Sequence, residues 1–434
     1  MKKYNLILIF ISVLGLFLGC KELDDRRPDG GDWGSEALEG YEITPINGGA
    51  EIRYNIPDDP DILYIMAEYE RNGRTYTEKA SVHTNLLTIE GFHRVDRVKA
   101  TLYKVNREEK RSDPVEIEFE PLESLIDIGV SSLEMVPGFG GIVASWENPQ
   151  STELGVRFMK VATDGEVDYD EMYFTTLEEE RRAFRGFDPE ESTFAISFED
   201  KWGNVSDTTY LTVTPFYETM IPKPYADFRG NIPYDNTTDL SGRTTATLWD
   251  GVVNTSRHGW LTNPSGSGLS MTFDMQQVAK LSRIVIHGYH INSVYGQVNI
   301  TKFELWGTDE IDGDRFADRP YWLDETSVRN SAIHGVDNTT VLPDQTFKED
   351  WEYLGWHEIP RYDRMVPPDP QGVLNLSANG TEYEMPIDAK PVRYIRLFVR
   401  EAAGVMPPPS NNYFSMGEIT FYGDNTAAAQ NEQQ

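Results

Sequence analysis

The sequence predicts an all-β protein made of successive β-sandwiches, and three observations support that fold class. Short runs in which apolar and polar residues alternate, such as VKATLYKV (98–105) and PVEIEFEP (114–121), are typical of half-buried strands. Two adjacent segments repeat the same sequence anchors, so one strand-rich unit occurs twice. After residue 240, longer loops separate further strand-like runs, and the one expected helical turn is LEEERRAF (177–184).

The duplicated units share three anchors that recur in the same order and at nearly equal offsets. Chance seldom produces such a match, which indicates a tandem repeat of about 90 residues per unit. The matched pairs are GGAEIRYNIP (48–57) with GGIVASWENP (140–149), EGFH (90–93) with RGFD (185–188), and SDPVEIEFEP (112–121) with SDTTYLTVTP (206–215).

Each repeated unit has the strand density of a small β-sandwich. About seven short strands in about 90 residues are typical of the immunoglobulin and fibronectin type III sandwiches. In the first unit, Asn72 and Gly73 separate two β-rich runs, which is a strong hairpin signal. Tyr54 and Trp146 occupy equivalent repeat positions beside alternating strands, so we expect both in hydrophobic cores rather than in ligand sites.

The first residues have the composition of an export signal. Lys2 and Lys3 precede an apolar run that ends at Cys20, a pattern typical of a signal peptide and too short for a spanning helix. Cys20 is the sole cysteine, and FLGC (17–20) resembles a bacterial lipobox. This resemblance implies that Cys20 carries lipid and that the lipid alone attaches the protein to the membrane. The alternative is an ordinary cleaved signal with an incidental cysteine.

The composition restricts the partners. The formal net charge of −32 repels nucleic acid and anionic lipid headgroups, so we expect no nucleic-acid partner. A neutral partner such as carbohydrate fits better, and solubility alone is the alternative explanation of this charge. The sequence contains no HExxH, GxSxG, P-loop or CxxC motif, and no carboxylate pair stands out by its spacing, so we expect no enzymatic activity.

Six segments of the third region occur in the order of a known family. They are LWDGVVNT followed by Trp260, SMTFDMQQVAKLSRIVIHGY, KFELWGTDE, WEYLG, VRYIRLFV and GEITFYG. The region resembles the discoidin domain, which is the coagulation factor type C domain, and family thirty-two carbohydrate-binding modules share its fold. The resemblance runs from Ser241 to Gly423 with an insertion at 311–348, and it implies an eight-stranded jelly roll.

The whole arrangement is similar to that of surface lipoproteins encoded with glycan-uptake systems in Bacteroidota. Acidic residues just after Cys20 also resemble the surface-export signal of such lipoproteins. This resemblance implies an outer-membrane location facing the cell exterior, with outer-membrane glycan-uptake proteins as partners. The expected boundaries are 1–19 for the signal peptide, 20–37 for a flexible tether, 38–122 and 123–219 for two fibronectin-like sandwiches, 220–240 for a linker, 241–424 for the discoidin-like jelly roll and 425–434 for a disordered tail.

The discoidin resemblance also implies a structural calcium ion. In that pattern an Asp-Gly turn, a threonine and a late glutamate surround the ion, and Asp250, Thr255 and Glu418 stand at those positions. Ca²⁺ takes six to eight oxygen ligands, including turn carbonyls, so the carbonyls of Thr247 and Val252 would complete the set. The alternative is that Asp250 only caps its turn through an Asx hydrogen bond and that Glu418 is exposed.

Two clusters of polar and aromatic residues form the candidate ligand site. Sugars present C–H faces that stack on aromatic rings, and hydroxyl groups that need fixed polar partners, so such clusters suit a poly- or oligosaccharide. The alternative is that these side chains pack loop against loop. The residues of the two clusters are Arg257 and His258 in the loop before Trp260, and Tyr289, His290 and Tyr295 in HGYHINSVYG (287–296).

The favoured function is non-catalytic binding of glycan at the cell surface through the discoidin-like domain, with the two sandwiches as spacers. The alternative is an adhesion or complex-assembly subunit that binds protein, and a third class is a glycosidase with an unrecognised site. An exposed groove of aromatic and polar groups would favour glycan, whereas a broad, flat apolar patch would favour protein. Clustered carboxylates beside a deep cleft would favour the glycosidase.

Overall fold

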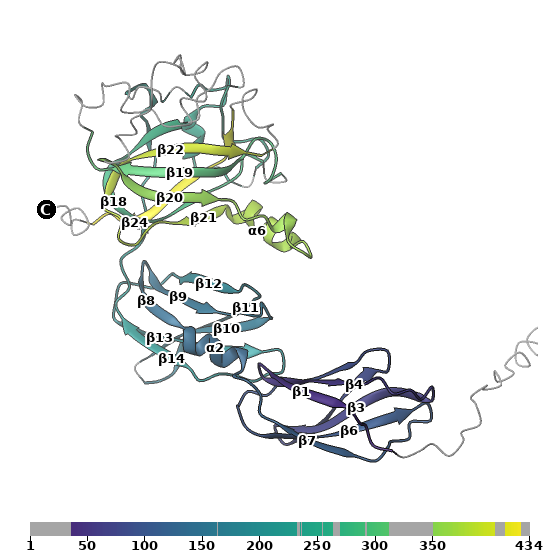
Figure 1. Cartoon of the computed structure of the whole chain (residues 1–434). Coiled ribbons are helices and arrows are strands. Elements are labelled where there is room, and N and C mark those ends of the chain that lie inside the picture. Colours follow the sequence, from purple (N-terminus) through teal and green to yellow (C-terminus); the bar gives the residue numbers. More distant parts are fainter. Residues whose placement is uncertain are drawn as a thin grey trace, which may run out of the picture.

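The computed structural model describes residues 36–426 apart from 163, 232–234, 236, 254, 264–269, 291–292, 312–349 and 404–412. The expected signal peptide, Cys20, most of the tether, nearly all of the insertion and the end of the tail lie outside the described residues. Three strand-rich units follow one another in a row, which confirms the predicted all-β chain of successive sandwiches (Figure 1). No helix in the described ranges combines the length and hydropathy needed to cross a bilayer.

The first unit packs a three-stranded sheet, ordered β1-β2-β5, on a four-stranded sheet, ordered β4-β3-β6-β7. Asn72 and Gly73 join β3 to β4 with φ angles of 51° and 71°, as a two-residue hairpin turn requires and as the sequence predicts. Tyr54 lies in the core, and its hydroxyl donates to the carbonyl of Thr84 at 2.7 Å. The strands are β1 (Tyr41–Ile46), β2 (Gly49–Tyr54), β3 (Ile62–Arg71), β4 (Arg74–Ser81), β5 (Leu86–Glu90), β6 (Val98–Asn106) and β7 (Val115–Phe119).

The second unit repeats this plan with sheets ordered β12-β9-β8 and β11-β10-β13-β14, and a short helix, α2, packs against β9 and β13. Residues 177–184, expected to form a helical turn, instead contain β12, which pairs along β9. Phe184 is buried and its ring centroid lies 4.1 Å from that of Phe158, so core packing overrides local helix propensity. The elements are α2 (Leu125–Ser132), β8 (Glu134–Gly138), β9 (Gly141–Glu147), β10 (Leu154–Val161), β11 (Val167–Thr175), β12 (Glu179–Phe184), β13 (Ser192–Asp200) and β14 (Thr209–Val213).

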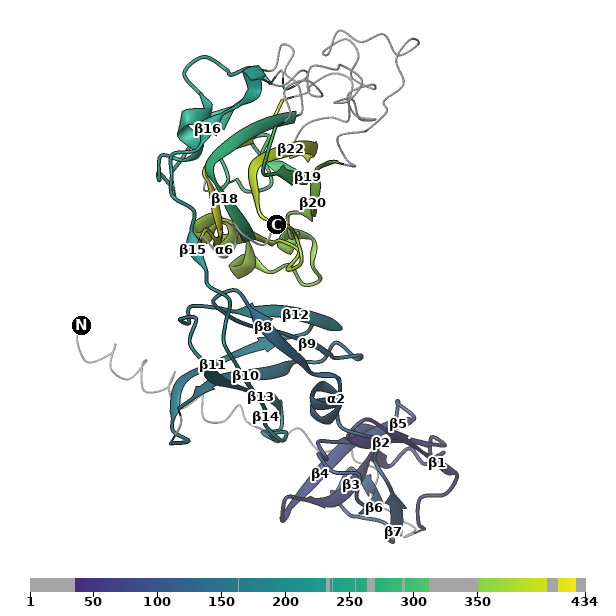
Figure 2. The same ribbon diagram turned by 90° about the vertical axis from the view of Figure 1, so that its left-hand side faces the viewer.

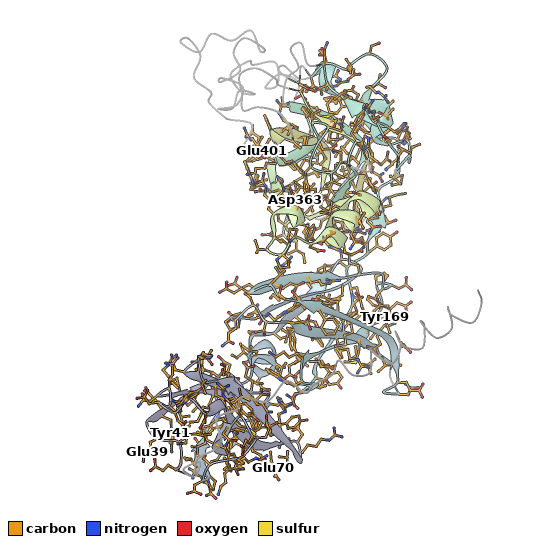
Figure 3. The ribbon with its side chains drawn as sticks, turned by 90° about the vertical axis from the view of Figure 1, so that its right-hand side faces the viewer. Glu39, Tyr41, Glu70, Tyr169, Asp363 and Glu401 are labelled. Carbon is orange, nitrogen blue, oxygen red and sulfur yellow. The ribbon has the colours of Figure 1, made fainter. Side chains whose placement is uncertain are left out.

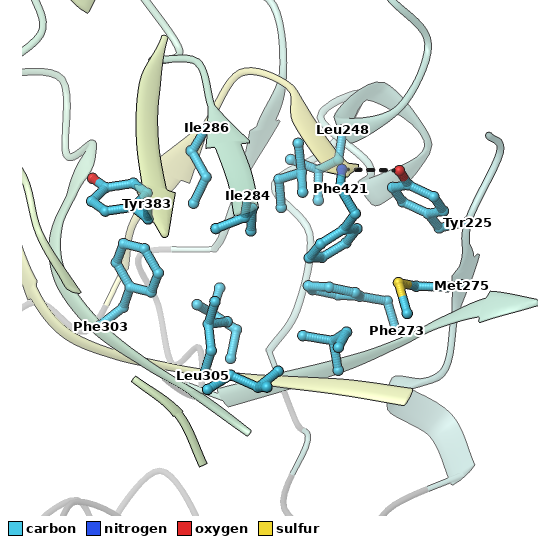
Figure 4. Packing of buried hydrophobic residues seen from close by; sticks show 14 of the residues in the cluster. Tyr225, Leu248, Phe273, Met275, Ile284, Ile286, Phe303, Leu305, Tyr383 and Phe421 are labelled. Atoms are coloured by element: carbon cyan, nitrogen blue, oxygen red, sulfur yellow. Dashed lines mark hydrogen bonds between the residues drawn. The ribbon is translucent and has the colours of Figure 1, made fainter. Parts of the chain in front are cut away.

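The third unit is a jelly-roll sandwich organised by one long strand, β18. Its first part pairs with β22, and beyond a register shift between Asp274 and Ala279 it pairs with β24, so β18 passes from one sheet to the other. The two sheets enclose the core shown in Figure 4, where Phe273 and Phe421 are fully buried. The elements are β15 (Thr219–Met220), β16 (Ala226–Asp227), β17 (Trp260–Leu261), β18 (Ser270–Ile286), β19 (Ile300–Thr308), β20 (Glu352–Glu358), α6 (Pro370–Asn379), β21 (Thr381–Glu384), β22 (Val392–Ala402), β23 (Ser415–Met416) and β24 (Ile419–Asp424).

The segment expected as a linker contributes to this third unit. Ile221 and Tyr225 belong to its core, and the Tyr225 hydroxyl accepts the backbone N–H of Phe421 at 3.2 Å. Arg185 of the second unit also reaches the third, because its Nη2 lies 2.5 Å from a carboxylate oxygen of Glu384 on β21. Packing and this ion pair therefore join the last two units directly.

Candidate functional site

Loops from two parts of the chain meet at one end of the third unit. The loop before β17 and the loop after β18 are joined by a β-bridge between Ser256 and His290. β17 itself pairs with β23, which fixes the first of these loops against the sandwich. The structure therefore brings together three of the predicted ligand residues, Arg257, His258 and His290, and we call these three residues the polar rim.

Both rim histidines are oriented by neighbouring side chains. His258 Nε2 lies 2.8 Å from Asp250 Oδ2, and because a carboxylate only accepts, the imidazole donates this bond. His290 Nε2 lies 2.8 Å from Ser256 Oγ. Asp250 also stabilises its own turn, since Oδ1 accepts the backbone N–H of Val252 at 2.9 Å. The imidazoles are thus held in place before any ligand arrives.

Arg257 is the exposed member of the polar rim. Its backbone has a φ of 62°, and its carbonyl oxygen accepts a hydrogen bond from Arg243 Nη1 at 2.5 Å. Among the residues that the structure describes, the Arg257 guanidinium makes no hydrogen bond or ion pair. Its planar set of N–H donors is therefore available to a ligand.

The two tyrosines predicted as a stacking surface do not fit that role. Tyr289 is only 5% exposed, and the guanidinium carbon of Arg243 lies 5.6 Å from its ring centroid, so little of the ring can meet a sugar. The Tyr295 hydroxyl donates to the carbonyl of Pro360 at 2.6 Å and accepts the N–H of Tyr362 at 3.1 Å. Tyr295 therefore ties its loop to a segment 65 residues further along the chain, a contact that the local sequence could not indicate.

The glutamate expected to bind calcium is buried and paired with a lysine. Glu418 is 1% exposed, and its Oε1 forms an ion pair with Lys223 Nζ and accepts the N–H of Gly251 at 3.1 Å. Lys223 Nζ also donates to Thr420 Oγ1 at 2.8 Å. Burial raises the pKa of Glu418, and the hydrogen bond and charge of Lys223 oppose this rise. Lys223 thus supplies a positive charge at the expected metal ligand.

As arranged, the expected ligand set does not fit a calcium ion. Asp250 is engaged in its turn and with a histidine, and the other carboxylate is paired with an ammonium group. The remaining expected ligands, Thr247, Val252 and Thr255, contribute only uncharged oxygens, whereas Ca²⁺ sites include carboxylates. Within the described part of the chain, no group of three or more His, Asp or Glu side chains is placed to hold a metal.

Sequence reasoning missed two aromatic residues on a different face of the third unit. Tyr353 and Trp356 of β20 are 45% and 50% exposed, although WEYLGWHEI indicates only a strand. Residues three apart point to opposite faces of a regular strand, so one of the two would be expected inside. The available signal was Gly355, because a glycine within a strand often marks a bulge that changes this alternation.

Comparison with known proteins gives three family matches along the chain, each to a domain of unknown function. The matches are DUF4959 at residues 35–121, DUF5126 at 122–224 and DUF5000 at 249–423. No curated protein matches the chain.

Several solved structures are similar to parts of the chain. A SusE-like protein is 21% identical with a TM-score of 0.35, covering 69% of this chain and 98% of its own. The family 32 carbohydrate-binding module of NanJ from C. perfringens, in complex with galactose, is 14% identical with a TM-score of 0.25, covering 47% and 98%. A segment of two fibronectin type III domains from chicken tenascin is 12% identical with a TM-score of 0.19, covering 41% and 99%. At these values the function must be inferred from the chemistry of the site.

Proposed function

We propose that the protein is a non-catalytic carbohydrate-binding lipoprotein of the cell surface, which captures glycan through its third unit. The first two sandwiches act as spacers between the membrane anchor and the binding unit, and the three units follow one another in Figure 2. Many anchored copies on one membrane bind a polysaccharide with higher avidity than one copy, which offsets a weak single site.

The polar rim is the observation that carries this proposal. Arg257 offers a planar fork of donors, which suits vicinal hydroxyl groups, and His258 and His290 offer imidazole groups held by Asp250 and Ser256. Groups that are fixed before binding lose little entropy when a ligand arrives. The net charge of −32 disfavours a polyanion, so the expected ligand is a neutral glycan.

Affinity electrophoresis of the full-length chain, purified in detergent, tests this function. Galactomannan, xyloglucan, arabinogalactan and soluble starch serve as neutral probes, and polygalacturonate serves as the acidic control. We expect slower migration in at least one neutral gel and none in the acidic gel. Unchanged migration in every neutral gel would contradict glycan capture.

The proposed location follows from the N-terminal sequence. A lone cysteine directly after a short apolar run is the pattern that supports a lipid anchor at Cys20. An anchor of this kind holds the three units outside the bilayer, where a polysaccharide can reach the polar rim. Outer-membrane glycan-uptake proteins are then the partners that would receive captured glycan.

A protein-binding subunit is the second candidate, because the second unit exposes apolar side chains. Phe174 and Met172 on β11 are 62% and 40% exposed, and both lie over Gly155, where a Cβ would meet them at 3.1 and 2.7 Å. This function would be favoured if the wild type binds none of the glycans and an outer-membrane uptake protein co-purifies with it. The same protein should not co-purify with Phe174→Asp.

A further inference from the structure

A β-bulge in the third unit places two aromatic side chains side by side on its outer surface. β20 is the edge strand next to β19, and the register puts Trp356 opposite Glu304 and Tyr353 opposite Trp306. The register shifts between Leu305 and Trp306, so β20 carries one extra residue at this point. The extra residue returns Tyr353 and Trp356 to the same face of the sheet, although they are three positions apart.

The bulge is specified by the residues between the two aromatic side chains. Gly355 has a φ of 121°, and a Cβ there would meet the His357 ring at 3.0 Å, so a larger residue is excluded in this conformation. Leu354 is fully buried, and its carbonyl accepts a hydrogen bond from His357 Nε2 at 3.1 Å. The placement of the aromatic pair is therefore part of the fold.

Both aromatic side chains are open to solvent on a rigid support. Trp356 is 50% exposed and Tyr353 is 45% exposed. Trp306 packs against Tyr353 with ring centroids 4.7 Å apart, and Trp306 itself is only 9% exposed. Because the rings are held by a strand and by a packed neighbour, stacking on them requires little further ordering.

A half-buried polar pair lies directly beside these rings. Arg400 Nη2 lies 2.9 Å from Glu304 Oε2, which also accepts the indole N–H of Trp306 at 3.2 Å. Within the described ranges, Glu304 Oε1 makes no hydrogen bond, which leaves one acceptor available. Burial and the Glu304 carboxylate raise the pKa of Tyr353, and Arg400 opposes this rise, so both charges act on the phenol group.

The charges of this surface favour a neutral ligand. Each cation is paired with carboxylates: Arg400 with Glu304, and Lys302 with Glu358 at 3.3 Å and with Glu401 at 3.6 Å. Glu401 is labelled on the third unit in Figure 3. Among the described residues, this surface therefore offers no unpaired cation to an anion, while its carboxylate oxygens and N–H groups can form hydrogen bonds with sugar hydroxyl groups.

We propose that Tyr353, Trp356, Glu304 and Arg400 form a second carbohydrate-binding surface, the aromatic face, for a neutral polysaccharide. The inference rests on the proposed function, but the aromatic face lies on β19, β20 and β22, whereas the polar rim lies in loops beside β17 and β18. The C–H faces of pyranose rings stack on Tyr353 and Trp356, and a sugar hydroxyl donates to Glu304 Oε1. Among the described strands β20 ends the sheet, and internal units of a long chain could lie along it.

Affinity electrophoresis of the full-length chain in the neutral polysaccharide gels also tests the aromatic face. Trp356→Ala and Tyr353→Ala remove the stacking rings, and because both side chains are exposed, neither should unfold the protein. Tyr210→Ala is the matched control, since Tyr210 is 61% exposed in the second unit. We expect the dissociation constant to rise about tenfold in Trp356→Ala for at least one polysaccharide, with no change in Tyr210→Ala.

The outcomes separate this inference from the proposed function. If Trp356→Ala and Tyr353→Ala bind every polysaccharide as tightly as the wild type does, the aromatic face is overturned. Weaker polysaccharide binding by Arg257→Ala would in that case still support capture by the polar rim. If the wild type binds none of the neutral polysaccharides, both proposals fall. A wild-type dimer that Trp356→Ala converts to a monomer in sedimentation would identify the surface as a contact between two copies and overturn the inference.

Discussion

Lys223 and Glu418 lie 195 residues apart in the sequence and form a buried ion pair beneath the turn that carries Asp250. The Glu418 carboxylate also accepts the N–H of Gly251, so one buried group connects the segment before β16, the turn and β24. A buried carboxylate without a counter-charge is strongly unfavourable, and in this structure an ammonium group from the same chain provides that charge. Glu418, which the discoidin resemblance assigns to a metal ion, is thus paired with Lys223 in this structure.

Thermal unfolding with and without calcium tests whether Lys223, rather than a metal ion, balances the charge of Glu418. We expect the same melting temperature in excess CaCl₂ and in excess chelator, because an ion stabilises a protein only when the folded state binds it. Lys223→Ala should lower the free energy of unfolding by about 3 kcal/mol or more, since it leaves a buried charge unpaired. The double variant Lys223→Met/Glu418→Gln is the control, and its free energy of unfolding should fall much less than that of Lys223→Ala. A wild-type melting temperature that rises with calcium would instead support the metal site.

Trp260→Ala should destabilise the third unit without a direct effect on any ligand contact. Trp260 is fully buried, its ring centroid lies 5.1 Å from that of Phe414, and its indole N–H donates to Asp239 at 2.7 Å. Removing so large a buried side chain costs about 3 to 5 kcal/mol. Chemical denaturation measures this loss in the free energy of unfolding. A Trp260→Ala variant whose free energy of unfolding lies within about 1 kcal/mol of the wild-type value would show that the core does not depend on this residue.

Much of the fold could be predicted from local patterns. Alternating runs indicate the strands, and Asn72-Gly73 indicates its hairpin because the turn requires positive φ at both positions. The strand β12 was missed because LEEERRAF contains good helix formers, and only its pairing with β9 and the burial of Phe184 decide its conformation. The contribution of Ile221 and Tyr225 to a core was missed because a segment rich in proline and asparagine is typical of a linker.

The candidate site was harder to predict, because its geometry depends on residues distant in sequence. The sequence brought Arg257 and His258 under consideration, but the partner Arg243 and the bridge to His290 arise only in the folded sheet. Lys223 gave no signal, since a single lysine pairs with Glu418 only after β24 folds beside it. Trp356 escaped notice because the bulge that exposes it depends on the register with β19.

Acidification should destabilise the third unit through His357. Burial lowers the pKa of His357 to about 4, against 6.5 for the free side chain, and the hydrogen bond to the Leu354 carbonyl opposes the shift. The unfolded chain therefore binds the proton more readily, so this stability is complete above about pH 6.5 and is lost as the pH falls toward 4. The difference is on the order of 3 kcal/mol.

The His357→Gln variant isolates this contribution, because glutamine retains an N–H donor and does not ionise. Urea unfolding of the wild type and the variant at pH 7 and at pH 4.5 measures it. We expect the wild type to lose more stability than the variant over this interval. Equal losses would show that His357 is not buried in its neutral form.

Cys20→Ala should release the protein from the membrane or leave the signal uncleaved. Wild-type protein is expected in the outer-membrane fraction with lipid on Cys20, since a lone cysteine directly after a short apolar run is the pattern that supports a lipid anchor. Cell fractionation with mass spectrometry of the mature N-terminus measures both properties. A wild-type protein that is soluble and unmodified at its N-terminus would exclude the anchor.

Titration calorimetry of the full-length chain with a neutral polysaccharide that retards it tests glycan capture by the polar rim most directly. Loss of one hydrogen-bonding group costs about 1 to 2 kcal/mol, so Arg257→Ala should weaken affinity by about 5- to 30-fold at an unchanged melting temperature. Arg257→Lys keeps the charge without the planar fork, so its affinity should lie between those of the wild type and Arg257→Ala. Affinities of Arg257→Ala and Arg257→Lys equal to that of the wild type would contradict capture at the polar rim.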